Sequence, residues 1–520
     1  MPSDRPNILV YMTDHQRADT IHPDHPCRTP NVQRVIDSGV LFTEHYTQTA
    51  HCCPSRASFM TGHYPTRHGV WNNICTTTRL TEGLAPGIRC FSEDLRESGY
   101  DLAYAGKWHV SGVEDPVDRG WDELLVTARK VADMQPRLEG MIEQVGKEDL
   151  DAPRAPGMIW RPGWVNRPAY GSRPDGGPKG YENVHDYQMA LTAIEHLPGM
   201  AQRREQTGEP WMLYVGPSGP HDPYVIPEKW AKMYDPDQVE LPESFWDTLQ
   251  DKPTVYQRMR HMYWGQMSER EVREAIAHFW GYCSMLDAIF GEVLDALEAT
   301  GQLENTIVIY TSDHGDYCGD HGLFAKGVPA FREAYNVPLA ISWPAAMTQT
   351  GVVCDEFTSQ ADMANTFREI AGVEPPETGM PGRSILPLML GERPADWREE
   401  MHTQFNGVEV YYTQRQVFTK DWKYVYNAFD FDELYDLRSD PREMVNLAAP
   451  CRHPRGAWNV GERRRFGEFV PWPELPPDLD AVRRDLLHRM WKFGHEQRDT
   501  TFNSYVTVAL APYGPAWGWL

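Results

Sequence analysis

Two short apolar runs, Asn7–Met12 near the start and Asn305–Thr311 in the second half, constrain the fold of this chain most strongly. Each has the length and composition of a buried strand, and an aspartate follows closely after each. Helical patterns such as that of residues 269–300 lie between the apolar runs, so strands and helices alternate. We therefore predict a large mixed α/β sheet sandwiched by helices, with Asp14 and Asp313 at the carboxyl ends of strands, where ligands bind in such sheets.

The chain divides into three predicted segments. Residues 1–395 are expected to form the main domain, and residues 396–499 a smaller C-terminal α+β subdomain of short strands and one helix, Asp478–Gln497, with Asp478 as its N-cap. Residues 500–520 form an aromatic, almost uncharged tail, which we expect to dock near a site or against a second subunit, making a homo-oligomer. Residues 115–181 are rich in Pro, Gly and Trp and are predicted to be irregular, either shaping a binding mouth or covering the surface.

The overall charge excludes several kinds of partner. The formal net charge is −24 at pH 7, which argues against nucleic acid and against an anionic membrane surface. An anionic substrate would therefore need a local cationic pocket. The chain has no signal-like leader before its first strand and no apolar span long enough to cross a bilayer, so we expect a cytoplasmic protein. Its nine cysteines, an odd number, are scattered, which speaks against a disulfide framework.

The strongest motif is Cys52-x-Pro54-Ser55-Arg56, followed shortly by Thr61-Gly62. Cys52 is the defining cysteine because it has Pro two residues on and Arg four residues on, while Cys53 occupies the variable position. Pro54 and the small residues after it suit a tight turn into a helix whose N-terminus faces an anion. A buried structural or redox pair of cysteines is the alternative interpretation. The motif resembles the signature of the type I sulfatases, in the alkaline phosphatase superfamily.

That resemblance implies a modified nucleophile. In the family, the cysteine at the position of Cys52 is oxidised to formylglycine, an aldehyde, by a formylglycine-generating enzyme. One hydroxyl of the hydrated aldehyde attacks sulfur, and the other then expels sulfate by C–O cleavage. Arg56 would hold the nucleophile and balance negative charge.

The resemblance also implies one divalent metal. Asp14, Asp313 and His314 match the ligand positions of the family, together with the modified Cys52. The family has Asp, Gln or Asn where this chain has His15, a softer ligand, which could shift the preference towards a transition metal or could be no ligand at all. Ca²⁺ is the expected ion, with Mn²⁺ and Mg²⁺ as alternatives.

Four further residues match motifs that surround sulfate in the family. Lys107 and His109 lie in Gly-Lys-Trp-His after an apparent strand, His221 in a Pro-His-x-Pro pattern, and Lys326 beyond Asp-His-Gly. By resemblance, Lys107 and Lys326 would neutralise sulfate oxygens, His109 would take a proton from the diol, and His221 would protonate the leaving group. Asn73 matches a position that contacts the nucleophile or the anion.

The function implied is hydrolysis of an organic sulfate monoester, carried by a small molecule or a saccharide; aryl, sugar and choline-like sulfates all stay open. The alternative is a phosphonate monoester or phosphodiester hydrolase, whose relatives look similar near Asp14 and in length. Those relatives have neutral residues at the Lys-Trp-His motif, so Lys107 and His109 favour a sulfatase. A non-catalytic binding protein with an unmodified Cys52 thiol is the rival from another class.

Overall fold

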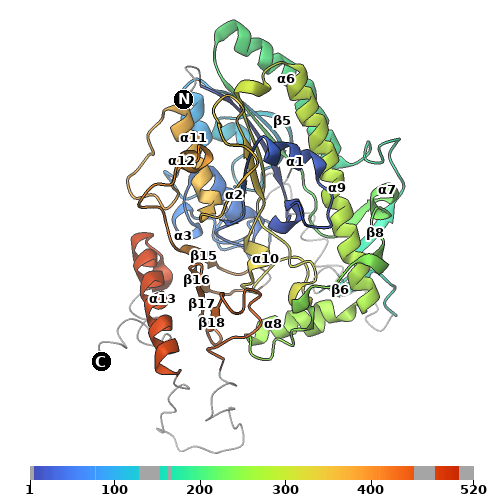
Figure 1. Ribbon diagram of the computed structural model, residues 1–520, viewed down its shortest axis with the longest axis vertical. Coiled ribbons are helices and arrows are strands. Elements are labelled where there is room, and N and C mark those ends of the chain that lie inside the picture. The colour runs from blue at the N-terminus through green and yellow to red at the C-terminus, as the bar shows by residue number, and fades with distance from the viewer. Residues whose placement is uncertain are drawn as a thin grey trace, which may run out of the picture.

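The computed structural model describes residues 5–76, 78–127, 153–161, 165–408, 410–449 and 475–502. Its centre is an eight-stranded mixed sheet with the strand order β13-β2-β12-β11-β1-β9-β4-β5 (Figure 1). In chain order these strands are β1 (Asn7–Thr13), β2 (Gly39–Phe42), β4 (Asp101–Lys107), β5 (Asp122–Thr127), β9 (Trp211–Gly216), β11 (Thr306–Ser312), β12 (Leu339–Ser342) and β13 (Val352–Cys354).

Helices cover both faces of this sheet, which confirms the predicted fold class. Alternate side chains of a strand point to opposite faces, and in β1 both sets are apolar. Ile8 and Val10 belong to a core shared with one group of helices, and Leu9 and Tyr11 to a core shared with the other. The first group is α2 (Cys52–Thr61), α4 (Phe91–Glu97) and α11 (Gln360–Ala371), and the second is α1 (Pro30–Asp37), α6 (His185–Thr207) and α9 (Glu269–Ala299).

The central strands bring their carboxyl ends to one edge. β1 pairs in parallel with β11 and β9, and β9 pairs in parallel with β4. The register places Thr13 opposite Ser312, so the next residues, Asp14 and Asp313, emerge side by side. β12 runs antiparallel to β11, which makes the sheet mixed. Residues that follow four neighbouring strands can therefore meet at a single site.

The C-terminal region is a small α+β unit. Strands β15 (Met401–Phe405), β16 (Gln414–Phe418), β17 (Trp422–Asn427) and β18 (Glu433–Asp436) form an antiparallel sheet. Helix α13 (Pro477–Glu496) lies beside it and packs Leu486, Leu487 and Met490 against it (Figure 1). The expected cap was wrong: Pro476 is the N-cap, and Asp478 lies within the first turn, where its charge still favours the positive helix end.

The prediction that residues 115–181 are irregular was wrong for much of their described part. β5 adds an edge strand to the main sheet, and β6 (Met158–Arg161), β7 (Val165–Pro168) and β8 (Tyr170–Arg173) form small two-stranded sheets. The partner of β8 is β10 (Tyr224–Pro227), far along the chain, so local sequence carries little sign of the pairing. The predicted tail lies almost wholly outside the described residues, and the division of the chain into three segments stays a prediction.

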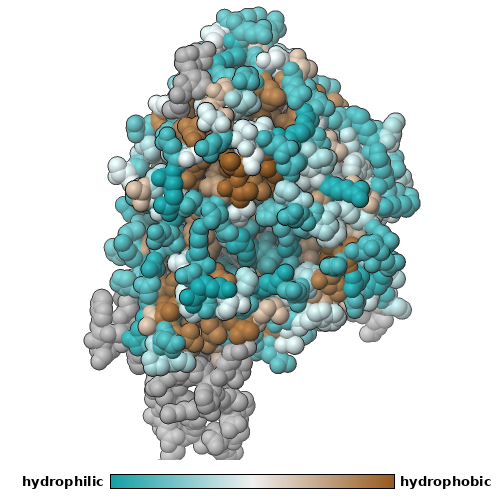
Figure 2. Space-filling view, viewed as in Figure 1, coloured by the Kyte–Doolittle hydropathy of each residue, from teal (hydrophilic) through white to brown (hydrophobic). Residues whose placement is uncertain are grey.

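The remaining strands and α-helices of the described chain are short: β3 (His45–Tyr46), β14 (Thr358–Ser359), α3 (Pro65–His68), α7 (Glu228–Ala231), α8 (Thr254–Arg258), α10 (Arg332–Tyr335) and α12 (Leu386–Met389). Among the described helices, none combines the length and apolar character that crossing a bilayer requires. Figure 2 shows a mostly hydrophilic face broken by separate apolar patches, as expected for a chain of net charge −24.

A buried ion pair ties the segment after α13 to the small sheet. Arg415 of β16 donates from Nε to Oδ2 of Asp499 at 2.5 Å, and both side chains are buried. Although burial opposes ionisation, Arg415 holds the pKa of Asp499 below its ordinary value. We predict that Asp499→Ala destabilises this region by about 3–5 kcal/mol, because it leaves a buried guanidinium without its counter-charge. Thermal unfolding at neutral pH measures the loss.

The matched control is Asp485→Ala, which removes a surface partner of Arg489 and should cost under about 0.5 kcal/mol. Because the pKa of Asp499 is lower in the folded protein, its contribution is present above about pH 4 and is lost as the pH falls. The difference in unfolding temperature between wild type and Asp499→Ala should therefore become smaller in acid. Equal unfolding temperatures of the two variants at neutral pH would contradict the prediction.

Candidate active site

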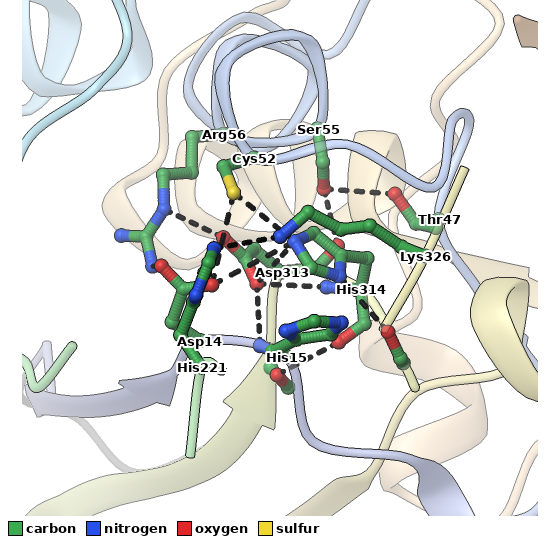
Figure 3. Close-up of polar contacts among 12 residues, drawn as sticks. Asp14, His15, Thr47, Cys52, Ser55, Arg56, His221, Asp313, His314 and Lys326 are labelled. Atoms are coloured by element: carbon green, nitrogen blue, oxygen red, sulfur yellow. Dashed lines mark hydrogen bonds and ion pairs between the residues drawn. The ribbon is translucent and has the colours of Figure 1, made fainter. Parts of the chain in front are cut away.

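Four potential metal ligands meet at the carboxyl edge of the central strands. Asp14 follows β1, Asp313 and His314 follow β11, and Cys52 begins α2 (Figure 3). One ligand atom from each lies within 4.8 Å of all the others, and all four residues are buried. Nε2 of His314 is 3.1 Å from Sγ of Cys52 and 3.6 Å from Oδ1 of Asp14. Two carboxylates, one imidazole and the side chain at position 52 form a set that fits one divalent cation.

Two buried cations balance the carboxylates. Nε of Arg56 donates to Oδ2 of Asp313 at 2.8 Å, and Nζ of Lys107 contacts Oδ2 of Asp14. Burial opposes ionisation of Asp14, yet Lys107 and Arg56 help to hold its pKa below the ordinary value. Lys107 and Lys326 likewise hold the pKa of the Cys52 thiol well below its ordinary value, against the effect of burial. The potential at position 52 therefore favours negative charge.

Helix α2 sets the direction of Cys52. The helix begins at Cys52 itself, with His51 as N-cap, so Pro54 lies in its first turn and not in a turn before it. Ser55 donates its hydroxyl to the backbone oxygen of Asp313, which fixes α2 to the end of β11. Asn73 accepts from the backbone N–H of Cys53 at 3.1 Å, so it supports the start of the helix. The positive end of α2 thus faces the cluster.

A close approach of two strands sets Lys107 and His109. Gly106 has φ 133°, and a Cβ atom there would lie 2.2 Å from the carbonyl oxygen of Gly216 on β9, so this position requires glycine. His109 follows with φ 53°, a left-handed conformation that non-glycine residues rarely adopt and that is frequent at functional sites. Its Nε2 contacts Sγ of Cys75, and the ring also interacts with Cys52.

His221 and Lys326 approach the ligand cluster as a pair. Nζ of Lys326 lies 2.8 Å from Nε2 of His221, and the His221 side chain is one-third exposed (Figure 3). The backbone N–H of Asp14 bonds to Gly219, which brings the segment after β9 against the cluster. The carboxylate of Asp186 accepts from the N–H groups of Ser218 and Gly219 and holds this segment in place.

His15 belongs to a neighbouring group and not to the four converging ligands. Its Nε2 lies 3.2 Å from Oδ2 of Asp316 and its Nδ1 3.8 Å from Oδ1 of Asp222. Neither ring nitrogen makes a hydrogen bond of good geometry, although the ring is fully buried. Burial, and then Lys326, hold its pKa well below the ordinary value, so the ring is neutral. Its contribution to the cluster is a backbone N–H, which donates to Oδ1 of Asp313 at 3.1 Å.

Several residues of the site escaped the sequence analysis. Oδ1 of Asp222 lies 3.2 Å from Nδ1 of His221, and Asp222 also pairs with Arg167 of β7. Asp316 accepts from the N–H groups of Cys318 and Ala325 and so shapes the loop that leads to Lys326. Asp222 is adjacent to His221 in sequence and could have been noticed. Arg167 gave no signal, because nothing local relates it to residue 222.

Comparison with known proteins agrees with this geometry. A family model described as Sulfatase matches residues 6–373, and a second, N-sulphoglucosamine sulphohydrolase, C-terminal, matches residues 319–454. The chain is similar to a choline-sulfatase of Rhizobium meliloti (strain 1021), 29% identical over 94% of this chain and 91% of that protein. It is also similar to the multifunctional alkaline phosphatase superfamily protein PehA of Trinickia caryophylli, 28% identical over 85% of this chain and 91% of that protein.

The fold is that of solved relatives. The structure of a phosphonate monoester hydrolase of Agrobacterium radiobacter superposes with a TM-score of 0.71 at 23% identity, over 95% of this chain and 96% of the other. At that identity the likeness concerns the fold alone. The Sulfatase match, in contrast, spans more than half of the chain and includes every ligand and every cation of the cluster. The protein is therefore an enzyme of the sulfatase family.

Proposed function

We propose that the protein hydrolyses an organic sulfate monoester, with Cys52 converted to formylglycine and with Asp14, Asp313 and His314 holding one divalent cation, Ca²⁺ in the first place. The observation that carries the proposal is the convergence of Cys52 both with oxygen-rich metal ligands and with the cations Lys107 and Lys326. Oxygen ligands are those that Ca²⁺ prefers. Sulfate esters are anions, and the cationic groups supply the local attraction that a chain of net charge −24 otherwise lacks.

The residues of the site have separate tasks in this proposal. When present, the hydrated aldehyde supplies the nucleophilic hydroxyl and the cation supplies Lewis-acid stabilisation of a sulfate oxygen. Arg56 orients Asp313 and balances its charge through its 2.8 Å bond. Lys107, which is buried beside Asp14 and position 52, stabilises charge that develops on the transferring group. His109 is in reach of position 52 and takes a proton from it.

The leaving group meets the pair of His221 and Lys326. Their nitrogen atoms are 2.8 Å apart, so a proton can be shared between the ammonium of Lys326 and Nε2 of His221. The partial exposure of His221 supports a position of the pair on the side from which an alcohol would depart. Asp222 holds Nδ1 of His221 and keeps the ring oriented. We assign protonation of the departing oxygen to this pair.

Phosphonate monoester hydrolysis is the second candidate. A sulfate monoester and a phosphonate monoester both carry a single negative charge, so charge alone does not separate them. They differ in shape, because sulfate offers three non-bridging oxygens and a phosphonate monoester two oxygens and a carbon substituent. Lys107 and His109 both lie beside position 52, where a third oxygen would be received, and this favours sulfate.

The first prediction for the active site concerns maturation of Cys52. In protein co-expressed with a formylglycine-generating enzyme, the peptide that carries Cys52 should have a lower mass than its thiol form, because an aldehyde replaces the thiol. Cys52→Ala should remove both this mass change and the activity. Cys53→Ala is the matched control and should keep the mass change, since position 53 is the variable position of the motif. An unmodified Cys52 in fully active protein would refute the proposed nucleophile.

The second prediction separates the two candidate reactions. At equal concentrations, the mature enzyme should hydrolyse an aryl sulfate faster than an aryl phosphonate monoester. Lys107→Ala should lower the sulfate rate by about 10²–10³ and reduce the preference, because it removes a group that stabilises developing charge. The measurement is kcat/KM for both substrates in both proteins. A clear preference of the wild type for the phosphonate would establish the second candidate instead.

The third prediction concerns the leaving group. His221→Ala should lower the rate on an alkyl sulfate by about 10²–10⁴ but change the rate on a nitrophenyl sulfate little, because nitrophenolate departs without a proton. Lys326→Ala should slow the alkyl sulfate more than the nitrophenyl sulfate, since Lys326 shares the proton with His221, but it should slow both, since Lys326 also attracts the sulfate. Lys107→Ala is the control and should slow both substrates alike. If His221→Ala also slows both substrates alike, His221 binds sulfate and does not protonate the leaving group.

A further inference from the structure

A second group of potential metal ligands lies beside the active site. Cys53 is the second residue of α2, Cys75 lies in the loop after α3, and His109 follows β4. One ligand atom of each residue lies within 4.8 Å of the other two, and Sγ of Cys75 contacts Nε2 of His109. Both cysteines are free thiols. Three segments that are remote in sequence thus place two sulfur atoms and one nitrogen atom around a common point.

The three ligands are held by surrounding contacts. The backbone N–H of Cys53 donates to Asn73 at 3.1 Å, and the hydroxyl of Thr76 donates to the backbone oxygen of Asn73 at 3.0 Å. These bonds fix the loop that carries Cys75 to the start of α2. Cys53 and His109 are buried, whereas Cys75 is only half-buried and gives access from solvent. The site is therefore preorganised and open on one side.

The chemistry of the ligands selects a soft or borderline metal. Zn²⁺ binds thiolate at about 2.3 Å and imidazole at about 2.0 Å in tetrahedral sites, so its ligand atoms lie about 3.3–3.8 Å apart. Atoms that are already within 4.8 Å need only small movements to reach this spacing. The neighbouring cluster of Asp14, Asp313 and His314 is richer in oxygen and suits a harder ion.

We propose that Cys53, Cys75 and His109 form a binding site for Zn²⁺, distinct from the site of the catalytic cation. Three protein ligands leave a fourth position for water, as in zinc sites that are open to solvent. A zinc ion on Nε2 of His109 fixes the ring beside Cys75 and prevents its interaction with position 52, so zinc binding inhibits the enzyme. This inhibition rests on the role proposed above for His109, whereas the binding itself does not.

Cobalt provides the direct test of binding. The protein is Cys52→Ser, which excludes the thiol of the active site, and saturating CaCl₂ occupies the oxygen-rich cluster. Added Co²⁺ should produce sulfur-to-cobalt charge-transfer absorption in the near ultraviolet that saturates at one equivalent and is abolished by Zn²⁺. A second substitution in this protein, either Cys75→Ser or Cys53→Ala, should remove the absorption. Adding Cys354→Ser, another half-buried cysteine on β13, should leave it unchanged.

Two outcomes would overturn the site: no charge-transfer absorption, or absorption that persists without Cys75. A second measurement tests the link to catalysis in the mature enzyme with saturating Ca²⁺. Zn²⁺ should inhibit it, and Cys75→Ser should raise the half-inhibitory concentration at least about tenfold, since the loss of one ligand weakens metal binding. Cobalt binding without zinc inhibition would overturn the claim that this metal controls His109. Zinc inhibition that is equal in wild type and Cys75→Ser would place the inhibitory ion elsewhere.

Discussion

The burial of two carboxylates side by side is the constraint on which the rest of this structure depends. Asp14 and Asp313 emerge from adjacent parallel strands and are fully shielded from water. Buried charges without compensation cost several kcal/mol each, so the surrounding chain must supply positive charge. Arg56 and Lys107 do so from α2 and β4, and α2 also carries Cys52 as its first residue. The cations that would bind an anionic substrate in the proposed function are thus the same cations that offset the cost of burying the two carboxylates.

Much of this arrangement could be predicted from sequence because it depends on short-range patterns. Apolar runs that end in aspartate identify buried strands, and parallel neighbours bring their carboxyl ends together, which is why Asp14, Asp313 and His314 meet. The direction of a side chain at such an end is not local information. His15 follows Asp14 directly and has a φ of 79°, yet its ring nitrogens lie nearest Asp222 and Asp316, and the ring only packs edge-on against that of His314.

The features that were missed depend on contacts between remote segments. Arg167 of β7 meets Asp222 because β8, the next strand, pairs with β10. The composition of β8 and β10 does not indicate that they pair. The predicted N-cap of α13 was wrong for a simpler reason. Asp478 is a residue type that is common at N-caps, but the prolines before it determine where the helix starts. Residue type therefore predicts a structure well where a single strand or turn determines it. It predicts the exact start of a helix poorly, because neighbouring start positions differ by only one or two residues.

The two groups of potential ligands beside α2 show that a signature motif does not identify every residue that can bind a metal near the site. The motif defines position 52 and leaves position 53 free, so it carries no information on whether a second thiol stands there. Here Cys53 points to Cys75 and His109, while Cys52 points to Asp14 and His314. His109 can face either group, since it contacts Cys75 and also interacts with Cys52. A residue shared by an oxygen-rich and a sulfur-rich group couples them, because a ring that a metal holds beside Cys75 cannot turn to serve position 52.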